Sequence, residues 1–128
     1  MSRKVVNLYG SETTKKAVAA SSANYDMNNI VDMTGISPEG MAFIAEASDS
    51  ASSPSVTVIL QTSNKEKPSA AAADWVDIGS SVMTINGDSN FGDFDFALIP
   101  GRWLRAKLTE GSGGTVNVWL SATVSEEL

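Results

Sequence analysis

The stretch DFDFALIPGRWLRAKLTEGSGGTVNVWLSATV, residues 93–124, decides the fold because apolar and polar side chains alternate through most of it. Breaks at Pro100-Gly101 and at residues 111–114 divide it into three alternating segments. Period-two alternation is typical of half-buried antiparallel strands. The alternation places Trp103 and Trp119 on the polar side of these strands. The residues predicted to face inward are Phe94, Phe96, Leu98, Leu104, Ala106, Leu108, Val116, Val118, Leu120, Ala122 and Val124.

The last two alternating segments predict a hairpin. Residues that face each other across an antiparallel hairpin have a constant sum of residue numbers, and both apolar sets here carry even numbers. The sum is therefore even, and a three-residue loop cut from residues 111–114, with one glycine in the left-handed conformation, fits. Trp119 then lies opposite either Lys107 or Arg105, with a cation beside its indole.

The composition excludes several classes of protein. A chain of 128 residues can form one domain with its own core, and the absence of cysteine and histidine removes disulfides, thiolate metal sites and the commonest general base. The net charge of −6 argues against a nucleic-acid surface. No segment resembles a membrane span or a signal peptide, so we expect a soluble protein made in a cytoplasm.

The charge is unevenly distributed along the chain. Residues 1–16 carry a net charge of +3, which leaves −9 for residues 17–128. Because residues 1–28 lack a clean period, we expect an N-terminal arm and connection outside the core, attached to an acidic β-sandwich domain at residues 29–128.

About eight strands with no convincing helix predict an all-β, single-domain antiparallel sandwich, with a jelly roll as the preferred architecture. Both faces of residues 41–47 are partly apolar, which predicts a central strand covered on both sides. Residues 35–40 read as a turn, and so does Asn86-Gly87, whereas residues 65–73 read as an exposed loop. Beyond residues 93–124, strands are expected at residues 3–9, 29–33, 41–47, 56–61, 75–78 and 81–85.

Acidic side chains offer two chemical hypotheses. Residues 88–95 collect oxygen ligands as a calcium loop does, but Gly92 stands where a ligand is required. The pairs Asp93 with Asp95 and Asp74 with Asp77 satisfy the bare spacing of glycosidase carboxylates, yet no orienting partner is evident. In both cases a solvated acidic surface is the favoured interpretation, and we predict no metal site and no catalytic residue.

The polar-side aromatics and the arm are the candidate binding residues. Trp103 and Trp119 fit three interpretations: a flat platform that stacks on sugars, a cation–π contact that shields the sheet, or a subunit interface. The interface hypothesis also includes Arg105 and Lys107. The arm could add a strand to a neighbouring sheet edge and pair with acidic groups, or it could be a frayed terminus. Its candidate contact residues are Arg3, Lys4, Val5, Val6, Leu8 and Tyr9.

Three short segments also resemble a known family. They are Val58-Ile59-Leu60-Gln61-Thr62-Ser63, then Trp75-Val76-Asp77-Ile78, then Leu98-Ile99-Pro100-Gly101-Arg102-Trp103-Leu104-Arg105. This pattern, over about residues 24–124, is similar to the small cement, or decoration, proteins of tailed-bacteriophage capsids. In that family a strand ending in Gln-Thr-Ser precedes a Trp-containing strand, and an Arg-Tyr-Leu-Arg element begins the penultimate strand. Trp103 replaces the usual Tyr here.

The resemblance implies a jelly-roll sandwich that assembles as a homotrimer on the capsid exterior, with no catalysis and no cofactor. The expected function is therefore that of a structural virion protein, made in the bacterial host cytoplasm, which stabilises the shell by bridging neighbouring copies of the major capsid protein. The alternative is a carbohydrate-binding module on a tail or head fibre that uses Trp103 and Trp119. Neither function involves nucleic acid or a membrane.

Overall fold

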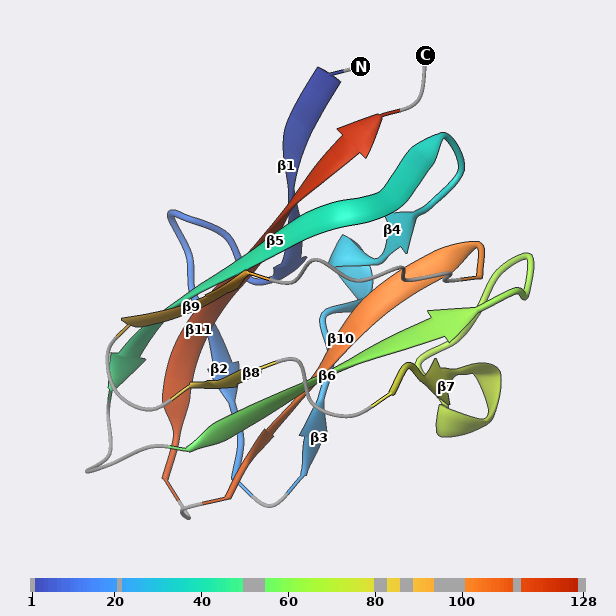
Figure 1. Cartoon of the computed structure of the whole chain (residues 1–128). Coiled ribbons are helices and arrows are strands. Elements are labelled where there is room, and N and C mark those ends of the chain that lie inside the picture. Colours follow the sequence, from blue (N-terminus) through green and yellow to red (C-terminus); the bar gives the residue numbers. More distant parts are fainter. Residues whose placement is uncertain are drawn as a thin grey trace.

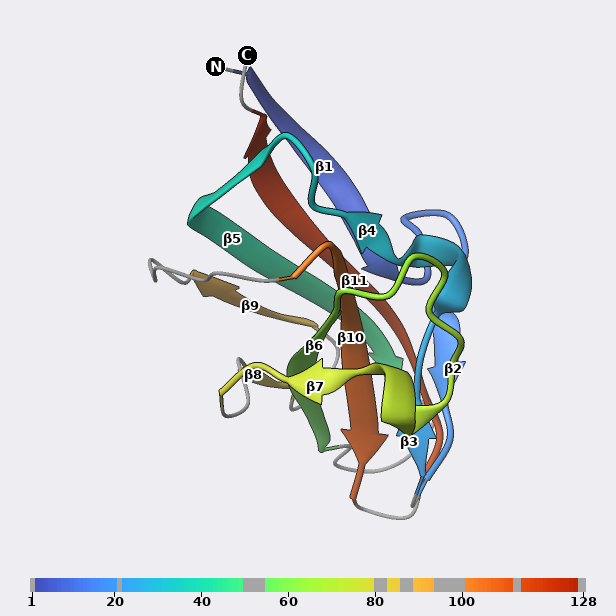
Figure 2. The same cartoon turned by 90° about the vertical axis from the view of Figure 1, so that its right-hand side faces the viewer.

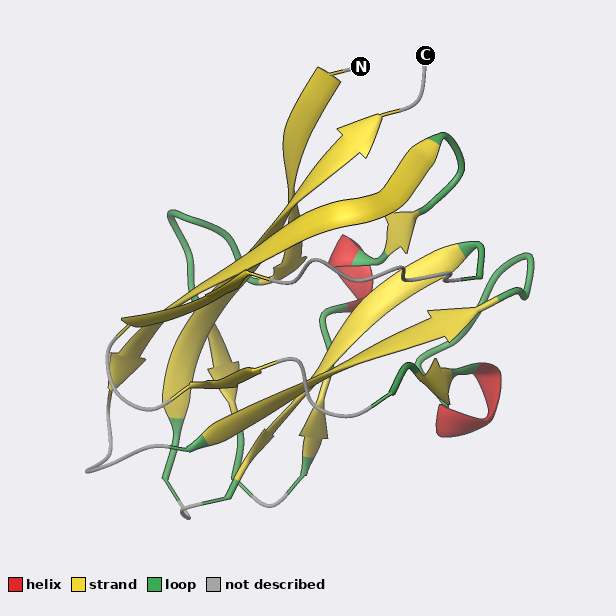
Figure 3. Ribbon diagram, viewed as in Figure 1, coloured by secondary structure: helices red, strands yellow, loops and turns green. Residues whose placement is uncertain are grey.

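Two antiparallel sheets enclose one hydrophobic core (Figure 1). The computed structural model describes residues 2–20, 22–49, 55–79, 83–85, 89–93, 101–111 and 114–126. Strands make up most of these ranges, and the only helical elements within them are two short 3₁₀ helices, η1 (Met27–Asn29) and η2 (Ala72–Asp74) (Figure 3). The predicted all-β sandwich is therefore confirmed.

The first sheet brings the two ends of the chain together. Its strand order is β1 (Ser2–Tyr9), β11 (Val116–Glu126), β5 (Ile36–Asp49) and β9 (Ser89–Asp93). The short strand β2 (Lys16–Val18) also pairs with β11. Ser2 lies opposite Glu126, so β1 begins where β11 ends, at one end of the sandwich (Figure 2).

The second sheet is centred on two long strands. Its order is β3 (Ala23–Asn24), β10 (Trp103–Glu110), β6 (Val56–Ser63) and β7 (Val76–Asp77). The short strand β4 (Val31–Asp32) pairs with β10, and β8 (Met83–Ile85) pairs with β6. The loop and η2 that connect β6 to β7 cover part of the outer face of this sheet.

The core confirms the predicted alternation wherever it is described. The even-numbered residues from 104 to 110 and from 116 to 124 face inward and are almost completely buried, together with residues of β5 and β6. Phe94, Phe96 and Leu98 lie outside the described residues, as does the predicted turn at Asn86-Gly87. The buried core includes Phe43, Ala45, Val56, Val58, Leu60, Leu104, Ala106, Leu108, Val116, Val118, Leu120, Ala122 and Val124.

The predicted hairpin between the last two strands is wrong. β10 pairs with β6, and β11 pairs with β1 and β5, so consecutive strands belong to opposite sheets. Trp119 lies opposite Glu46, whereas Arg105 lies opposite Gln61. Alternation shows which side chains face the core, but two strands on opposite sides of a sandwich face the same core just as two strands of one hairpin do.

The prediction that the N-terminal segment lies outside the core is also wrong. β1 pairs with β11 from Ser2 onward, and Leu8 and Tyr9 are fully buried. The register shifts between Asn7 and Tyr9, so two successive residues after the shift face inward and the period-two pattern is lost. Residues 1–28 contribute β1 and β2 to the first sheet and β3 to the second.

Two predicted details in the middle of the chain also change. β5 starts at Ile36, inside the predicted turn, and pairs with β11 and β9 as a central strand. One of its faces is open, however, because Ile44 is 47% exposed while Phe43 is buried. β9 occupies part of the predicted acidic loop. Residues 65–71 form a loop, as predicted, that leads into η2.

Leu8→Ala tests whether β1 belongs to the core. Removing a fully buried side chain should lower the free energy of unfolding by about 3 kcal/mol. Val5→Ala is the matched control on the same strand, since Val5 is 62% exposed and its truncation should cost no more than about 0.5 kcal/mol. Urea unfolding of both variants would measure the difference, and equal small effects would show that β1 is a loosely attached arm.

Candidate functional site

A buried guanidinium lies on the outer face of the second sheet. Arg105 of β10 is only 1% exposed although its side chain points away from the core. Its Cζ lies 3.6 Å from the centroid of the Tyr25 ring and 4.3 Å from that of the Trp75 ring. Tyr25 follows β3 and Trp75 precedes β7, so two connecting segments cover the same charge. Cation–π contact with two rings stabilises it there.

Arg105 donates its hydrogen bonds to neutral acceptors. Nε donates to Gln61 Oε1 at 2.8 Å, and Nη1 donates to the Ala70 carbonyl at 3.2 Å and contacts Met27 Sδ at 3.3 Å. Nη2 has no hydrogen-bond partner among the described residues, and no aspartate or glutamate there forms an ion pair with the guanidinium. Because burial disfavours its charged form, the pKa of Arg105 is lowered.

The remaining charges of this face are arranged around Asp77. Gln61 Nε2 donates to Asp77 Oδ1 at 2.7 Å, and Lys107 Nζ lies 3.4 Å from the same oxygen. The hydrogen bond from Gln61 and the charge of Lys107 lower the pKa of Asp77. Hydrogen bonds from Lys65 and Ser69 lower the pKa of Asp74. Both carboxylates of the nominal Asp74–Asp77 pair are therefore held in the ionised form, which does not suit a general acid.

The tryptophans lie on different sheets and do not form one platform. Trp103 of β10 donates from Nε1 to the Lys65 carbonyl at 3.0 Å, and the Arg102 guanidinium lies 5.2 Å from its ring. Trp119 of β11 donates from Nε1 to Asn7 Oδ1 at 2.8 Å. The predicted contact of Trp119 with Arg105 or Lys107 is wrong, because the core separates β10 from β11. Of the four proposed interface residues, Trp103, Arg105 and Lys107 share a sheet, and Arg105 is too deeply buried to contact another subunit.

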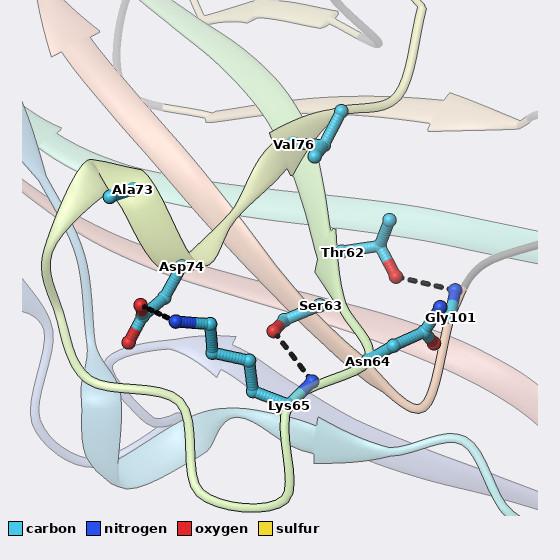
Figure 4. A pocket seen from close by; sticks show the side chains of 8 residues that line it. All are labelled: Thr62, Ser63, Asn64, Lys65, Ala73, Asp74, Val76 and Gly101. Carbon is cyan, nitrogen blue, oxygen red and sulfur yellow. Dashed lines mark hydrogen bonds and ion pairs between the residues drawn. The ribbon is translucent and has the colours of Figure 1, made fainter.

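A hollow of about 710 Å³ opens beside Trp103, where the loop after β6 meets η2 and β7 (Figure 4). Lys65 Nζ reaches Asp74 Oδ1 at 2.7 Å across it, and Asn64 Oδ1 accepts from the Arg102 amide at 3.0 Å. These polar side chains already bond to one another or to the backbone. Val76, in contrast, is 68% exposed at the rim. The hollow is lined by Thr62, Ser63, Asn64, Lys65, Ala73, Asp74, Val76 and Gly101.

Three lysines lie at the edge of the molecule at β1, and they line two further hollows together with Asp26 and Asp32. These hollows, of about 360 Å³ each, lie between β1, the turn that follows it and η1, and Asn7, Asn28 and Asn29 line both. Lys15 and Lys16 border one hollow and Lys4 borders the other. We call this surface, made of Lys4, Asn7, Lys15, Lys16, Asn28 and Asn29, the basic edge.

Asp26 holds the backbone of the basic edge in place through hydrogen bonds. Its buried carboxylate accepts hydrogen bonds from the Gly10 amide at 2.9 Å and from Asn29 Nδ2 at 2.7 Å, and it caps η1 through the Asn28 amide. Three of the six cations elsewhere lie beside a carboxylate, in the pairs Lys65–Asp74, Arg102–Asp32 and Lys107–Asp77. Lys15 and Lys16 have no such partner in the described part of the chain.

The candidate contact residues of the N-terminal segment separate into three groups. Leu8 and Tyr9 are fully buried and cannot touch a partner in the folded chain. Val6 is partly buried against the core, and Lys4 lies on the basic edge 3.9 Å from Glu126. Arg3 and Val5 are exposed on the outer face of the first sheet.

Sequence reasoning missed the residues that surround Arg105 and the residue that holds the basic edge in place. Tyr25, Gln61 and Trp75 surround Arg105, and Asp26 fixes the turn after β1, yet none was predicted to do so. The available signal was weak. Asp26 precedes Asn28-Asn29 as a capping residue does, whereas nothing in the sequence around Arg105 indicates that Tyr25 and Trp75 cover it.

The fold defines the chain as an antiparallel β-sandwich protein. No protein-family model matches it, and neither the curated proteins nor the solved structures contain a match. No helix of the described residues is long and apolar enough to cross a membrane. In the same residues no group of three or more aspartate or glutamate side chains is placed to hold a metal ion. Of the calcium-loop candidate, residues 88–95, the structure describes only the backbone of residues 89–93.

Arg105→Lys and Arg105→Met test the stacked guanidinium. Lysine keeps the charge but cannot stack between two rings or reach the same acceptors, so we expect a loss of about 3 kcal/mol in the free energy of unfolding. Methionine removes the buried charge and should cost about half as much. Chemical denaturation measures both. A larger loss for Arg105→Met would show that the hydrogen bonds to Gln61 and Ala70 matter more than the stacking.

Tyr9 should make stability fall at high pH. It donates a hydrogen bond to the Ala17 carbonyl, and burial followed by the charge of Asp26 raises its pKa from 10.0 to about 12. The unfolded chain loses this proton first, so the stabilisation is complete below pH 10 and is lost between pH 10 and pH 12. The loss reaches at most about 1.4 kcal/mol per pH unit. Tyr9→Phe should flatten this dependence in unfolding experiments, and an unchanged slope would assign it to other groups.

Proposed function

We propose that this chain is a structural virion protein that binds the exterior of a phage capsid and stabilises it by bridging neighbouring capsid subunits. The observation that carries the proposal is the basic edge. Three lysines project there from an otherwise acidic sandwich, and two of them have no carboxylate partner among the described residues. The resemblance of residues 24–124 to cement proteins supports the same function and adds the jelly-roll topology to the proposal.

Mass action explains how such a protein would act. A partner that binds the assembled lattice but not free capsid subunits stabilises the lattice by the free energy of binding. Three linked copies gain avidity over one, so we also propose assembly as a homotrimer on the major capsid protein. The lysines of the basic edge would face acidic groups of that protein. Virion association and the absence of enzyme activity are part of the same proposal.

Carbohydrate binding is the second candidate, because the partly exposed Trp103 lies next to the hollow of about 710 Å³. Its Nε1 already donates to the Lys65 carbonyl, and Lys65 lines that hollow. The separation of Trp103 from Trp119 weakens this candidate, since the two rings cannot stack on one glycan. A glycan array that shows binding, together with loss of binding in Trp103→Ala, would favour this function over capsid binding.

Charge reversal at the basic edge tests capsid binding. Lys15→Glu and Lys16→Glu should each reduce the affinity for empty capsids that lack this protein by at least about fivefold, because a favourable charge contact becomes repulsive. Lys67→Glu is the matched control, an identical charge change at an exposed position in the loop after β6. Co-sedimentation with capsids at several salt concentrations measures the effect, which should shrink as screening increases.

Two results would count against these assignments. If the unmodified chain fails to bind capsids, the proposed function is wrong. If Lys15→Glu, Lys16→Glu and Lys67→Glu bind as the unmodified chain does, the basic edge is not the contact surface.

A further inference from the structure

The outer face of the first sheet is low in charge. It is formed by alternate residues of β1, β11 and β5, with the small side chains of Ser121 and Thr123 near its centre. Val5 and Ile44 lie on either side of them and are 62% and 47% exposed, and Trp119 is partly exposed on the same face. A surface with apolar groups at the centre and charges at the rim has the composition of a protein interface.

The strand register gives this face an approximate symmetry about Ala122 of β11. Val5 lies beside Thr123 on one flank, and Ile44 lies beside Ser121 on the other. Further out, Arg3 lies beside Ser125, and Glu46 lies beside Trp119. The two apolar residues and the two opposite charges thus occupy matching register positions on opposite flanks of β11.

Neither of these charges has a counterion among the described residues. In the part that the structure describes, Arg3 has no carboxylate within ion-pair distance and Glu46 has no cation within that distance. Both side chains are exposed. A face with one unpaired charge of each sign at opposite corners is complementary to itself after a two-fold rotation.

We propose that a second copy of this chain packs face to face on this surface. In such a two-fold contact Arg3 meets Glu46 of the partner subunit, and Glu46 meets Arg3 of the partner subunit. Val5, Ile44 and Trp119 lose solvent-exposed apolar surface at the centre. Aligned packing of two sheets is a common arrangement in β proteins, and the small residues between them allow close approach.

The two-fold contact leaves the lysines of the basic edge free, because Lys4, Lys15 and Lys16 do not lie on this face. Neighbouring three-fold positions of an icosahedral shell are related by two-fold axes. If the proposed capsid function holds, this contact would therefore link adjacent trimers into a continuous outer network. That last consequence rests on the proposed function, whereas the contact itself can be tested without a capsid.

Sedimentation velocity of the full chain, from about micromolar to about millimolar concentration, tests the contact. The sedimentation coefficient of the unmodified chain should rise with concentration. Arg3→Glu and Glu46→Arg should each raise the dissociation constant at least about tenfold, because each places like charges together twice. The double variant Arg3→Glu/Glu46→Arg should associate as the unmodified chain does. An equimolar mixture of the two single variants should also associate, since every contact then joins opposite charges.

Matched controls separate this contact from a general effect of charge. Lys67→Glu and Glu12→Arg make the same charge changes at exposed positions away from the face, and they should leave association unchanged. A chain that stays at one size throughout the concentration range overturns the proposal. Association that the single variants do not weaken, or that neither the double variant nor the mixture restores, also overturns it. Capsid binding measured in parallel shows whether the proposed function fails or holds independently of this result.

Discussion

The outer half of the second sheet depends on the burial of one guanidinium. Arg105 joins β10 to β6 through Gln61, to the connection before η1 through Tyr25, and to the loop after β6 through Ala70 and Trp75. Two aromatic rings and neutral acceptors replace the carboxylate that usually accompanies a buried cation. Because the contact links segments that are far apart in the sequence, its loss would weaken the attachment of the loop after β6, which Trp103 also holds through the Lys65 carbonyl.

The charges of the described residues are distributed differently on the two sides of the molecule. On the side of the second sheet Lys65, Arg102 and Lys107 each lie beside an aspartate, whereas Arg105 and Lys67 have no carboxylate partner among the described residues. Lys15 and Lys16 also have none there, and they are neighbours at the turn after β1. An acidic protein can therefore present a positive surface to an acidic partner, although its net charge gives no indication of this.

The sequence was a good guide to faces and a poor guide to neighbours. Alternation correctly predicted that Leu104 and Leu120 point into the core, because it reports only the side of the strand. It could not show that β10 and β11 lie in opposite sheets, since both arrangements bury the same residues. The exposure of Arg105 was mispredicted for a related reason: the strand pattern correctly sets its direction, but its cover comes from Tyr25 and Trp75, whose contacts with it span many residues. The register shift after Asn7 similarly concealed the burial of Leu8 and Tyr9.

The pairing of β1 with β11 also sets the order in which the molecule can form. These strands come from the two ends of the described chain. The consecutive strands β10 and β11 do not form a hairpin with each other but pair with strands from earlier in the sequence. Contacts between residues so distant in sequence close large loops, and such topologies fold slowly. During synthesis the side chains of Leu8 and Tyr9 would stay exposed until β11 leaves the ribosome and pairs with β1. The sheet that gives the protein its proposed partner surfaces is therefore the one completed last.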